Sequence, residues 1–485
     1  MNMMRSARTL KLFRQLLVLF PLAILLATTP VKGLGIAYGG EEFSRSRESR
    51  PNIVFLFADD LGWTDLGSFG SQYYETPNID RLRREGMKFT NAYANAPNCA
   101  PTRACLLSGR YTPRHGVYTV STGSRGEERN RKMIPVENRM DLPHSEVTFA
   151  EALGSEGYAT GCFGKWHLGK SEQYAPTTQG FDEWAYRSQK NPHPATDYVT
   201  ERAVKFIHKN AERPFFAYLP YHAVHTPIKA PKHLIEKYAS KKPVGGHDDP
   251  VYAAMLEELD LAIGRVLQTL DELKLTEKTM VVFFSDNGGM GGYERAGITG
   301  GERFAGNDIT DNAPLHGGKG MLYEGGIRVP LIVRYPGVVE PGSQCGEPVI
   351  GIDFYPTFLE LTDSDGDPNH QLDGKSLIPL LTSSGSASLN RDALYWHFPG
   401  YLQAAQDGSS WRTTPAGAIR SGDYKLIEFF ETGRIELYDL REDLGEMVDL
   451  TARMPQRAAE LHDKLVAWRK MVRAPMPTQK PNLGE

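Results

Sequence analysis

Two apolar runs that end in acidic side chains constrain the fold of this chain more than any other feature. The first run, residues 52–58, leads into Asp59 and Asp60, and the second, residues 280–284, leads through Ser285 into Asp286 and Asn287. A short apolar run without polar alternation is typical of a strand buried on both faces of a parallel sheet. Open sheets of this kind bind ligands at the carboxyl ends of their strands. We therefore expect an α/β fold with these side chains at one edge of its sheet.

Together, Asp59, Asp60, Asp286 and Asn287 predict a metal site built from oxygen ligands. Two adjacent carboxylates at the end of a buried strand are costly unless a cation or hydrogen-bond donors meet them. Asp59 and Asp60 taken alone fit a solvated turn equally well, but the same pattern after the second run favours a metal ion. Three carboxylates and one amide suit Ca²⁺, with Mg²⁺ as the second choice, and do not suit Zn²⁺.

Further patterns extend the alternation of strands and helices along the chain. Apolar runs predict strands at residues 158–163, 215–219 and 331–334, and helical spacing predicts a long helix at residues 250–273. Shorter helices are expected at residues 76–86, 145–153 and 350–361. In the first of these, Thr76 is expected to cap the helix ahead of Pro77, with Ile79 and Leu82 facing the core.

The pattern changes after about residue 362. A Ser-rich stretch at residues 382–390 precedes short alternating strands at residues 418–419, 424–429 and 435–439 and an amphipathic helix at residues 456–472. A chain of 485 residues also exceeds what one hydrophobic core commonly supports. We therefore predict a large mixed, mostly parallel sheet sandwiched by helices in residues 51–390, and a smaller C-terminal antiparallel sheet with a helix in residues 391–485.

The N-terminus differs in kind from the rest of the chain. Basic residues precede an apolar run from Leu16 to Ala27, which is typical of a secretory signal peptide within residues 1–37, with cleavage near Gly33 or Ala37. An uncleaved membrane anchor is the alternative. The polar residues 38–50 would form a tether. We expect an exported protein, periplasmic or secreted, with no stable membrane association after cleavage.

Charge and cysteine content narrow the class of protein further. Removal of residues 1–33, which hold five basic side chains and no acidic one, lowers the formal net charge from −4 to −9. So acidic a protein has no general nucleic-acid-binding surface, and we expect the cations of its cleft to be confined to the catalytic centre. Four cysteines are too few for a disulfide scaffold. The sequence has no Asn-x-Ser/Thr site, which favours a bacterial protein over a glycosylated lysosomal one.

The segment from Cys99 to Arg110 carries the strongest chemical signal. It reads Cys-Ala-Pro-Thr-Arg-Ala-Cys-Leu-Leu-Ser-Gly-Arg, so a candidate nucleophile is followed by a proline and then by the guanidinium of Arg103, at the start of an apolar run. That run predicts a buried helix, and a helix N-terminus beside a reactive group is a natural anion site. An arbitrary cysteine is more often structural, but here the whole Cys-x-Pro-x-Arg pattern is present.

This segment resembles the signature of the formylglycine-dependent sulfatases, of the arylsulfatase and N-acetylgalactosamine-6-sulfatase kind, in the alkaline phosphatase superfamily. Other matching segments are Gly-Lys-Trp-His-Leu-Gly at residues 164–169, His-Thr-Pro at residues 225–227 and Gly-Lys-Gly at residues 318–320. The resemblance runs from about Pro51 to Leu450. It implies that a formylglycine-generating enzyme oxidises Cys99 to an aldehyde, and that residue 99 joins the four oxygen ligands around one Ca²⁺ ion.

The resemblance also implies a role for each site residue. The hydrate of the aldehyde at residue 99 would attack sulfur, with Arg103 supporting the hydrate. Lys165 and Lys319 would bind the sulfate, His225 would protonate the leaving oxygen and His167 would assist the elimination of sulfate. The roles of Ser188 and His222 are not predicted.

The substrate class expected from the resemblance is a sulfated carbohydrate, in a cleft walled partly by the polar loop at residues 119–141. Trp396 either offers an aromatic face to a sugar ring or packs between the two sheets. Two alternative functions stay open: a phosphonate monoester or phosphodiester hydrolase of the same superfamily, and a catalytically silent carbohydrate-binding relative, which the intact set of site residues disfavours. The sequence predicts neither the sugar, the sulfate position, the exo or endo action nor the oligomeric state.

Overall fold

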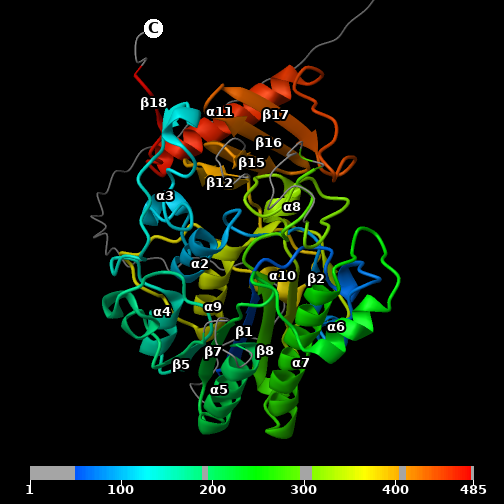
Figure 1. The fold of residues 1–485 in the computed structure, drawn as a ribbon. Helices are drawn as coiled ribbons and strands as arrows, with labels where there is room; N and C mark the ends of the chain where they lie inside the picture. The colour runs from blue at the N-terminus through cyan, green and yellow to red at the C-terminus, as the bar shows by residue number, and fades with distance from the viewer. Residues whose placement is uncertain (1–49, 188–194, 295, 297–307, 404–410, 482–485) are drawn as a thin grey trace, which may run out of the picture. The chain divides into compact units, whose positions relative to one another are not determined.

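A mixed sheet of eight strands forms the centre of the fold (Figure 1). The computed structural model describes residues 50–187, 195–294, 296, 308–403 and 411–481, which belong to one compact unit. The predicted signal peptide, nearly all of the predicted tether and Ser188 lie outside these residues. In spatial order the strands are β10 (Gln344–Cys345), β2 (Met87–Phe89), β9 (Leu331–Arg334), β8 (Thr279–Ser285), β1 (Asn52–Ala58), β7 (Phe215–Pro220), β5 (Ala159–Phe163) and β6 (Glu183–Ala185).

The five strands from β8 to β6 run parallel, whereas β9 is antiparallel to both β8 and β2. In register, Ala58 at the end of β1 pairs with Ser285 at the end of β8. The five strands predicted within residues 51–390 are all in this sheet, which confirms the large mixed, mostly parallel sheet. No helix within the described residues is long and apolar enough to cross a membrane.

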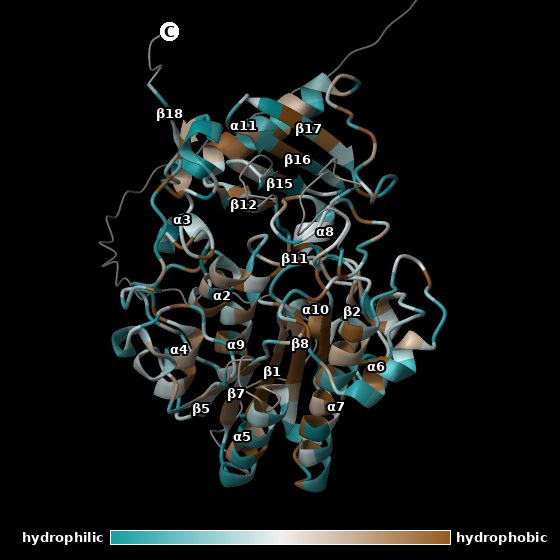
Figure 2. Cartoon of the chain, in the orientation of Figure 1, coloured by the Kyte–Doolittle hydropathy of each residue, from teal (hydrophilic) through white to brown (hydrophobic). Residues whose placement is uncertain are grey.

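Helices cover both faces of the sheet, because alternate side chains of β1 are apolar on both sides. Phe55 and Phe57 belong to one hydrophobic core, and Val54 and Leu56 to the other. Figure 2 shows the strands of the sheet in the hydrophobic colour, between helices whose colour varies around their axes. The first core contains α2 (Cys99–Ser108), α4 (Phe149–Ser155), α9 (Phe354–Thr362) and α10 (Ile378–Thr382); the second contains α1 (Pro77–Arg84), α5 (Ala195–Lys209), α6 (Lys232–Ala239) and α7 (Pro250–Glu272).

Two helix starts differ from the sequence prediction. The Thr76 side chain does not cap α1; its hydroxyl accepts from the Gly67 amide at 3.0 Å, and Asp260 of α7 accepts from the amides of Asn78 and Ile79 instead. The helix expected from residue 145 begins at Phe149, because Thr148 and Glu151 form a capping box ahead of it.

The C-terminal part of the chain forms the predicted smaller antiparallel sheet with a helix. Its strand order is β12 (Leu394–Phe398), β15 (Ala416–Ser421), β16 (Tyr424–Phe429) and β17 (Arg434–Asp439), and α11 (Pro455–Met471) packs on it. The remaining helices are α3 (Thr112–His115) and α8 (Glu324–Ile327), and the remaining strands pair as β3 (Ala92–Tyr93) with β11 (Val349–Ile350), β13 (Leu402–Gln403) with β14 (Trp411–Thr413), and β4 (Met133–Ile134) with β18 (Thr478–Gln479).

Candidate active site

The carboxyl ends of four neighbouring parallel strands deliver most of the predicted site residues. Asp59 and Asp60 follow β1, and Asp286 and Asn287 follow β8 beside it. Lys165 follows β5, and the segment with His222 and His225 follows β7. This placement explains why residues more than two hundred positions apart meet at one edge.

Asp59 and Asp60 lie at the centre of the site, fully or almost fully buried. Lys165 donates a hydrogen bond to Oδ2 of Asp59, and Lys319 donates to Oδ2 of Asp60 at 2.6 Å. Burial alone would raise the pKa of both carboxyls, but these ammonium groups and His225 hold the pKa of Asp59 well below its usual range and lower that of Asp60. Both carboxyls are therefore negatively charged inside the protein.

Arg103 ties the helix α2 to the strand ends. Its Nη2 donates to Oδ2 of Asp286 at 2.7 Å, its Nη1 donates to the Lys165 carbonyl at 2.7 Å, and Oδ2 of Asp59 lies 3.6 Å from Nη2. The guanidinium is fully buried, and Asp286 and Asp59 keep it protonated by raising its pKa against the effect of burial. Arg103 is thus a fixed positive charge held by two carboxylates.

Cys99 is the first residue of α2, so the buried helix predicted from the apolar run begins before that run. Its side chain is buried, and every residue of this helix is buried with it. Burial raises the pKa of the Cys99 thiol, but Lys165, Lys319 and a hydrogen bond to His225 outweigh burial, so that the pKa is lowered. The helix N-terminus and two ammonium groups therefore create a positive environment around this side chain.

His167 and His225 are held in opposite charge states. Burial followed by the charges of Lys165 and Arg103 lowers the pKa of His167 to about 2. Burial disfavours protonation of His225 as well, but Asp60 outweighs it and raises the pKa to about 9. Nε2 of His225 lies 3.6 Å from Oδ2 of Asp60. At neutral pH the His225 ring therefore carries a proton that it can donate, whereas the His167 ring is neutral.

The predicted metal ligands are partly assembled. Asp59, Asp60, Cys99 and His225 each offer one ligand atom, and these atoms lie within 4.8 Å of one another. Asn287 donates to Oδ1 of Asp60 at 2.9 Å, whereas Asp286 accepts from the Asp60 amide at 3.1 Å and otherwise holds Arg103.

Two buried oxygens test whether a cation fits this site. Among the described residues, neither Oδ1 of Asp59 nor Oδ1 of Asn287 has a hydrogen-bond partner. A buried oxygen without a donor is costly, and a hard cation would satisfy both oxygens. The donor set therefore fits Ca²⁺ or Mg²⁺, which would compete with Lys165 and Lys319 for the two aspartates.

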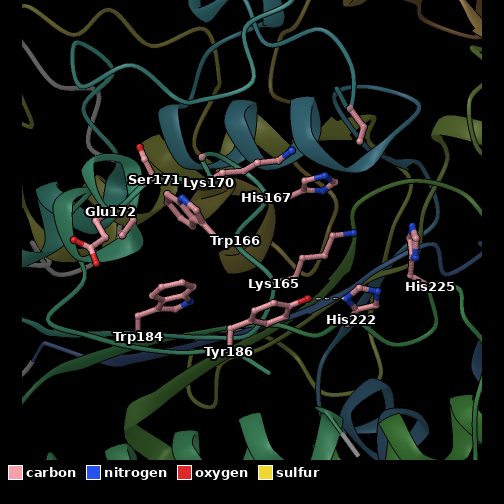
Figure 3. A pocket seen from close by; sticks show the side chains of 13 residues that line it. Lys165, Trp166, His167, Lys170, Ser171, Glu172, Trp184, Tyr186, His222 and His225 are labelled. Carbon is pink, nitrogen blue, oxygen red and sulfur yellow. Dashed lines mark hydrogen bonds between the residues drawn. The ribbon is translucent and has the colours of Figure 1, made fainter. Parts of the chain in front are cut away.

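A cavity of about 600 Å³ opens beside these residues and is lined by His167, His222 and His225. Figure 3 shows Trp166 and Trp184 on one side of this pocket and Lys165, His222 and His225 on the other, with the Tyr186 hydroxyl directed at His222. Trp184 and Tyr186 are 42% and 37% exposed, so their rings are available to a ligand. The Tyr186 hydroxyl lies 3.3 Å from Nδ1 of His222.

A second cavity, of about 430 Å³, is lined by Cys99, Lys319, Arg125 and Arg412. Val120, from the loop predicted to wall the cleft, lines both cavities. The two arginines correct the expectation that the cations of the cleft are confined to the catalytic centre. Sequence patterns missed them because Arg125 is on an irregular loop and Arg412 is in the small C-terminal part of the chain.

Trp396 packs between the two sheets and does not face either cavity. It is 1% exposed, and its indole N–H donates to the Ala94 carbonyl at 2.8 Å. The packing interpretation of this residue is therefore the correct one. Trp184 and Tyr186 were not singled out from the sequence, since Trp184 lies in β6, a strand of only three residues, and Tyr186 follows that strand directly.

Comparison with known families adds independent information to this geometry. The Sulfatase family model matches residues 51–364, and a model of the N-sulphoglucosamine sulphohydrolase C-terminal region matches residues 316–471. The chain belongs to the sulfatase family. It is therefore a sulfatase enzyme, and the predicted membership of the alkaline phosphatase superfamily is confirmed.

Several characterised sulfatases resemble the chain over most of its length. A "Sulfatase" of Formosa agariphila is 35% identical, covering 87% of this chain and 89% of that protein. The mouse steryl-sulfatase is 30% identical over 88% of this chain and 83% of its own, and the dog N-acetylgalactosamine-6-sulfatase is 31% identical over 71% and 68%.

The solved structure of Ps i-CgsB superposes with a TM-score of 0.71 and 26% identity, covering 86% of this sulfatase and 92% of that chain. The same protein has been solved in complex with k-i-k-neocarrahexaose.

Proposed function

We propose that this sulfatase removes sulfate from a sulfated carbohydrate, using a formylglycine made from Cys99 and a bound Ca²⁺ ion. The observation that carries this proposal is the placement of the Cys99 side chain at the buried N-terminus of α2, with Lys165, Lys319 and His225 around it. Few other reactions require a buried nucleophile position, two fixed cations and a proton donor together.

The roles of the cations follow from their charge and their position. A sulfate ester carries negative charge on its non-bridging oxygens, and Lys165 and Lys319 stay protonated because Asp59 and Asp60 raise their pKa against burial. They are thus able to hold the sulfate beside residue 99. Arg103 orients the segment that follows β5 through its bond to the Lys165 carbonyl.

The roles of the histidines follow from their charge states. His225 is protonated at neutral pH and lines both cavities, so it can give a proton to the leaving oxygen of the substrate. His167 is neutral and can accept a hydrogen bond near residue 99, where it would assist the elimination of sulfate. When present, the hydrated aldehyde at residue 99 would supply the oxygen nucleophile, and Ca²⁺ held by Asp59, Asp60, Asp286 and Asn287 would supply positive charge.

The larger cavity supports a carbohydrate as the substrate. Exposed aromatic rings such as Trp184 and Tyr186 present an apolar face and a polar edge, which suits the alternating faces of a sugar ring. The complex of Ps i-CgsB with a neocarrahexaose is consistent with this substrate class. The Formosa relative supports a bacterial origin. We propose that the enzyme is exported. We also propose that the boundary between its large and small parts lies near residue 390, as predicted from the sequence.

A substrate panel tests the proposal. The modified, metal-loaded enzyme should hydrolyse a sulfated oligosaccharide with a higher kcat/KM than a small aryl sulfate, and should act on aryl phosphate diesters and phosphonates more slowly than on either. Faster turnover of a phosphonate or phosphodiester than of sulfate esters would favour the alternative hydrolase. Efficient turnover of aryl sulfate without turnover of any sulfated saccharide would overturn the proposal that the substrate is a carbohydrate.

The Trp184→Ala variant tests the aromatic contact directly. We expect kcat/KM to fall by about tenfold on the oligosaccharide, with little change on the aryl sulfate, because only the sugar reaches this ring. Met447→Ala, which removes an exposed apolar side chain elsewhere, should change neither rate. An equal loss on both substrates in Trp184→Ala would show that Trp184 supports the fold instead.

A further inference from the structure

Two arginines share a cavity with the sulfate-binding residues, and neither has a role in the proposed chemistry. The 430 Å³ cavity is lined by Cys99, His225 and Lys319, and also by Arg125 and Arg412. Arg412 is 9% exposed and Arg125 is half-buried. Arginines that only keep a protein soluble lie on its exposed surface, so the positions of these two need another explanation.

Arg412 is fixed next to Lys319. Its guanidinium lies over the ring of Tyr293 at 4.7 Å, and the hydroxyl of Tyr293 donates to the Lys319 carbonyl at 3.0 Å. Its stem packs on Gly320, where an added Cβ would come 3.2 Å from Cδ of Arg412. The arginine of β14 is thus attached to the same segment that carries a catalytic cation.

Arg125 is brought to the same place by a separate loop. Its guanidinium donates to the Val120 carbonyl, and the next residue, Gly126, packs so closely on Trp411 that an added Cβ would lie 2.4 Å from the indole. Ser124 also forms a bridge with Tyr401. The loop therefore packs against β14, directly before Arg412.

The guanidinium groups of Arg125 and Arg412 lie close enough to repel one another. Burial lowers the pKa of Arg125, and the charge of Arg412 lowers it further. Lys319 adds a third cation to the lining of the same cavity. Like charges held close together on the wall of one cavity favour the binding of an anion there.

We propose that Arg125 and Arg412 form a subsite for a second anionic group of the substrate, so that the enzyme prefers a carbohydrate carrying another sulfate or a carboxylate near the sulfate it removes. The planar fork of a guanidinium matches the paired oxygens of both groups. This inference rests on the proposed function, and it assigns the specificity of the same cleft. A second sulfate ester and a uronic acid carboxylate share this chemistry, and the experiment separates them.

The test compares kcat/KM for three defined saccharides that share one scissile sulfate: one otherwise neutral, one with a second sulfate and one with a neighbouring uronate. We expect the enzyme to prefer at least one doubly anionic saccharide over the neutral one by about tenfold, since a charge-assisted hydrogen bond to a buried group contributes on this scale. The preferred saccharide identifies the source of the anion.

Variants then assign the preference to the two arginines. Arg125→Gln and Arg412→Gln should each remove part of this tenfold preference, lowering the ratio of kcat/KM between the doubly anionic and the neutral saccharide by roughly threefold. Arg125→Lys and Arg412→Lys keep the positive charge, so they should retain part of the preference for the doubly anionic saccharide. This result would show that the Gln variants lose the preference through loss of charge and not through misfolding. Arg129→Gln, on the same loop with a side chain 81% exposed, should leave the ratio unchanged.

Three results would contradict the inference. A native enzyme without any preference between the saccharides would overturn it, and so would Gln variants that keep the native ratio or Lys variants that lose it completely. If the enzyme cleaves an aryl sulfate but none of the three saccharides, the proposed function fails instead, because a carbohydrate is then not the substrate.

Discussion

At the scale of single residues, His167 and His225 show how one cluster of charges can set opposite protonation states. Both rings are largely enclosed, yet His167 faces cations and stays neutral, while His225 faces Asp60 and stays protonated. The backbones of Asp60 and His167 both have positive φ, at 64° and 66°, which is uncommon for residues with a side chain. Such strain is found where a site requires one exact side-chain direction.

The first prediction concerns Asp286 and the metal. We expect Asp286→Ala to weaken Ca²⁺ binding by at least about tenfold and to lower turnover with it, because the site loses a carboxylate and the partner of Arg103. Elemental analysis after dialysis measures bound Ca²⁺ independently of activity.

Two comparisons complete this test. Asp197→Ala, which removes an exposed partner of Arg265, should keep full metal content and activity. Full Ca²⁺ occupancy in Asp286→Ala, or stoichiometric Zn²⁺ in the native protein, would disprove the ligand assignment.

At the scale of elements, the start of α1 is held by a residue from α7. Asp260 is fully buried and accepts from the amides of Asn78 and Ile79 at 3.1 and 2.8 Å, while the Thr76 side chain bonds elsewhere. Pro77 at the first position already removes one donor of the helix. The cap is therefore a tertiary contact that joins two helices on one face of the sheet.

The second prediction follows from that contact. Asp260→Asn should lower the free energy of unfolding by about 1–3 kcal/mol, because the amide side chain offers one acceptor fewer to the buried N–H groups of Asn78 and Ile79. Denaturant unfolding measures the change. Asp271→Asn provides the matched control, since it also removes a bond from α7 to α1, but the ion pair with Arg81 is exposed and contributes at most about 1 kcal/mol. Equal losses in the two variants would refute the capping role.

Sequence patterns predicted the elements better than their contacts. The runs that became β1 and β8 were recognised because their burial leaves a continuous apolar pattern, and Asp59 and Asp286 were found because they follow those runs. Trp184, Arg125 and Arg412 leave no periodic signal, since their positions depend on which loop packs on which strand. The cap by Asp260 was missed for the same reason, because it joins residues 182 positions apart.

At the scale of the whole molecule, a buried charge network connects the small C-terminal sheet to α8, which precedes strand β9 of the large sheet. Lys425 of β16 donates to Glu324 of α8 at 2.9 Å and pairs with Glu446 at 2.8 Å, and all three side chains are fully buried. Arg328 also holds Glu324, at 2.6 Å. Burial raises the pKa of Glu446 to about 7, whereas Lys425 and Arg328 lower that of Glu324 to about 2 against burial.

The third prediction concerns this network. Lys425→Met should destabilise the protein by about 3 kcal/mol or more, because two buried carboxylates lose their shared cation. The loss should grow with pH. When folding raises the pKa of a carboxyl group, that group stabilises the protein at pH values below its pKa in the unfolded chain. This stabilisation is lost as the pH rises through the pKa of the folded state, which is about 7 for Glu446 in the native protein.

Unfolding below and above that pH measures the effect. Lys464→Met, which removes an exposed ion pair with Asp392, should cost at most about 1 kcal/mol at either pH. A Lys425→Met penalty that shrinks as pH rises would contradict this account of the network.

We expect residue 99 to be formylglycine in the active enzyme, and mass spectrometry of the tryptic peptide spanning residues 89–103 measures this modification. In protein made with a formylglycine-generating enzyme, the peptide should carry a residue in which the cysteine sulfur has been replaced by oxygen with loss of two hydrogens. The modified fraction should also rise in proportion to sulfatase activity across preparations. An unmodified thiol at Cys99 in a preparation fully active on sulfate esters would disprove the formylglycine mechanism.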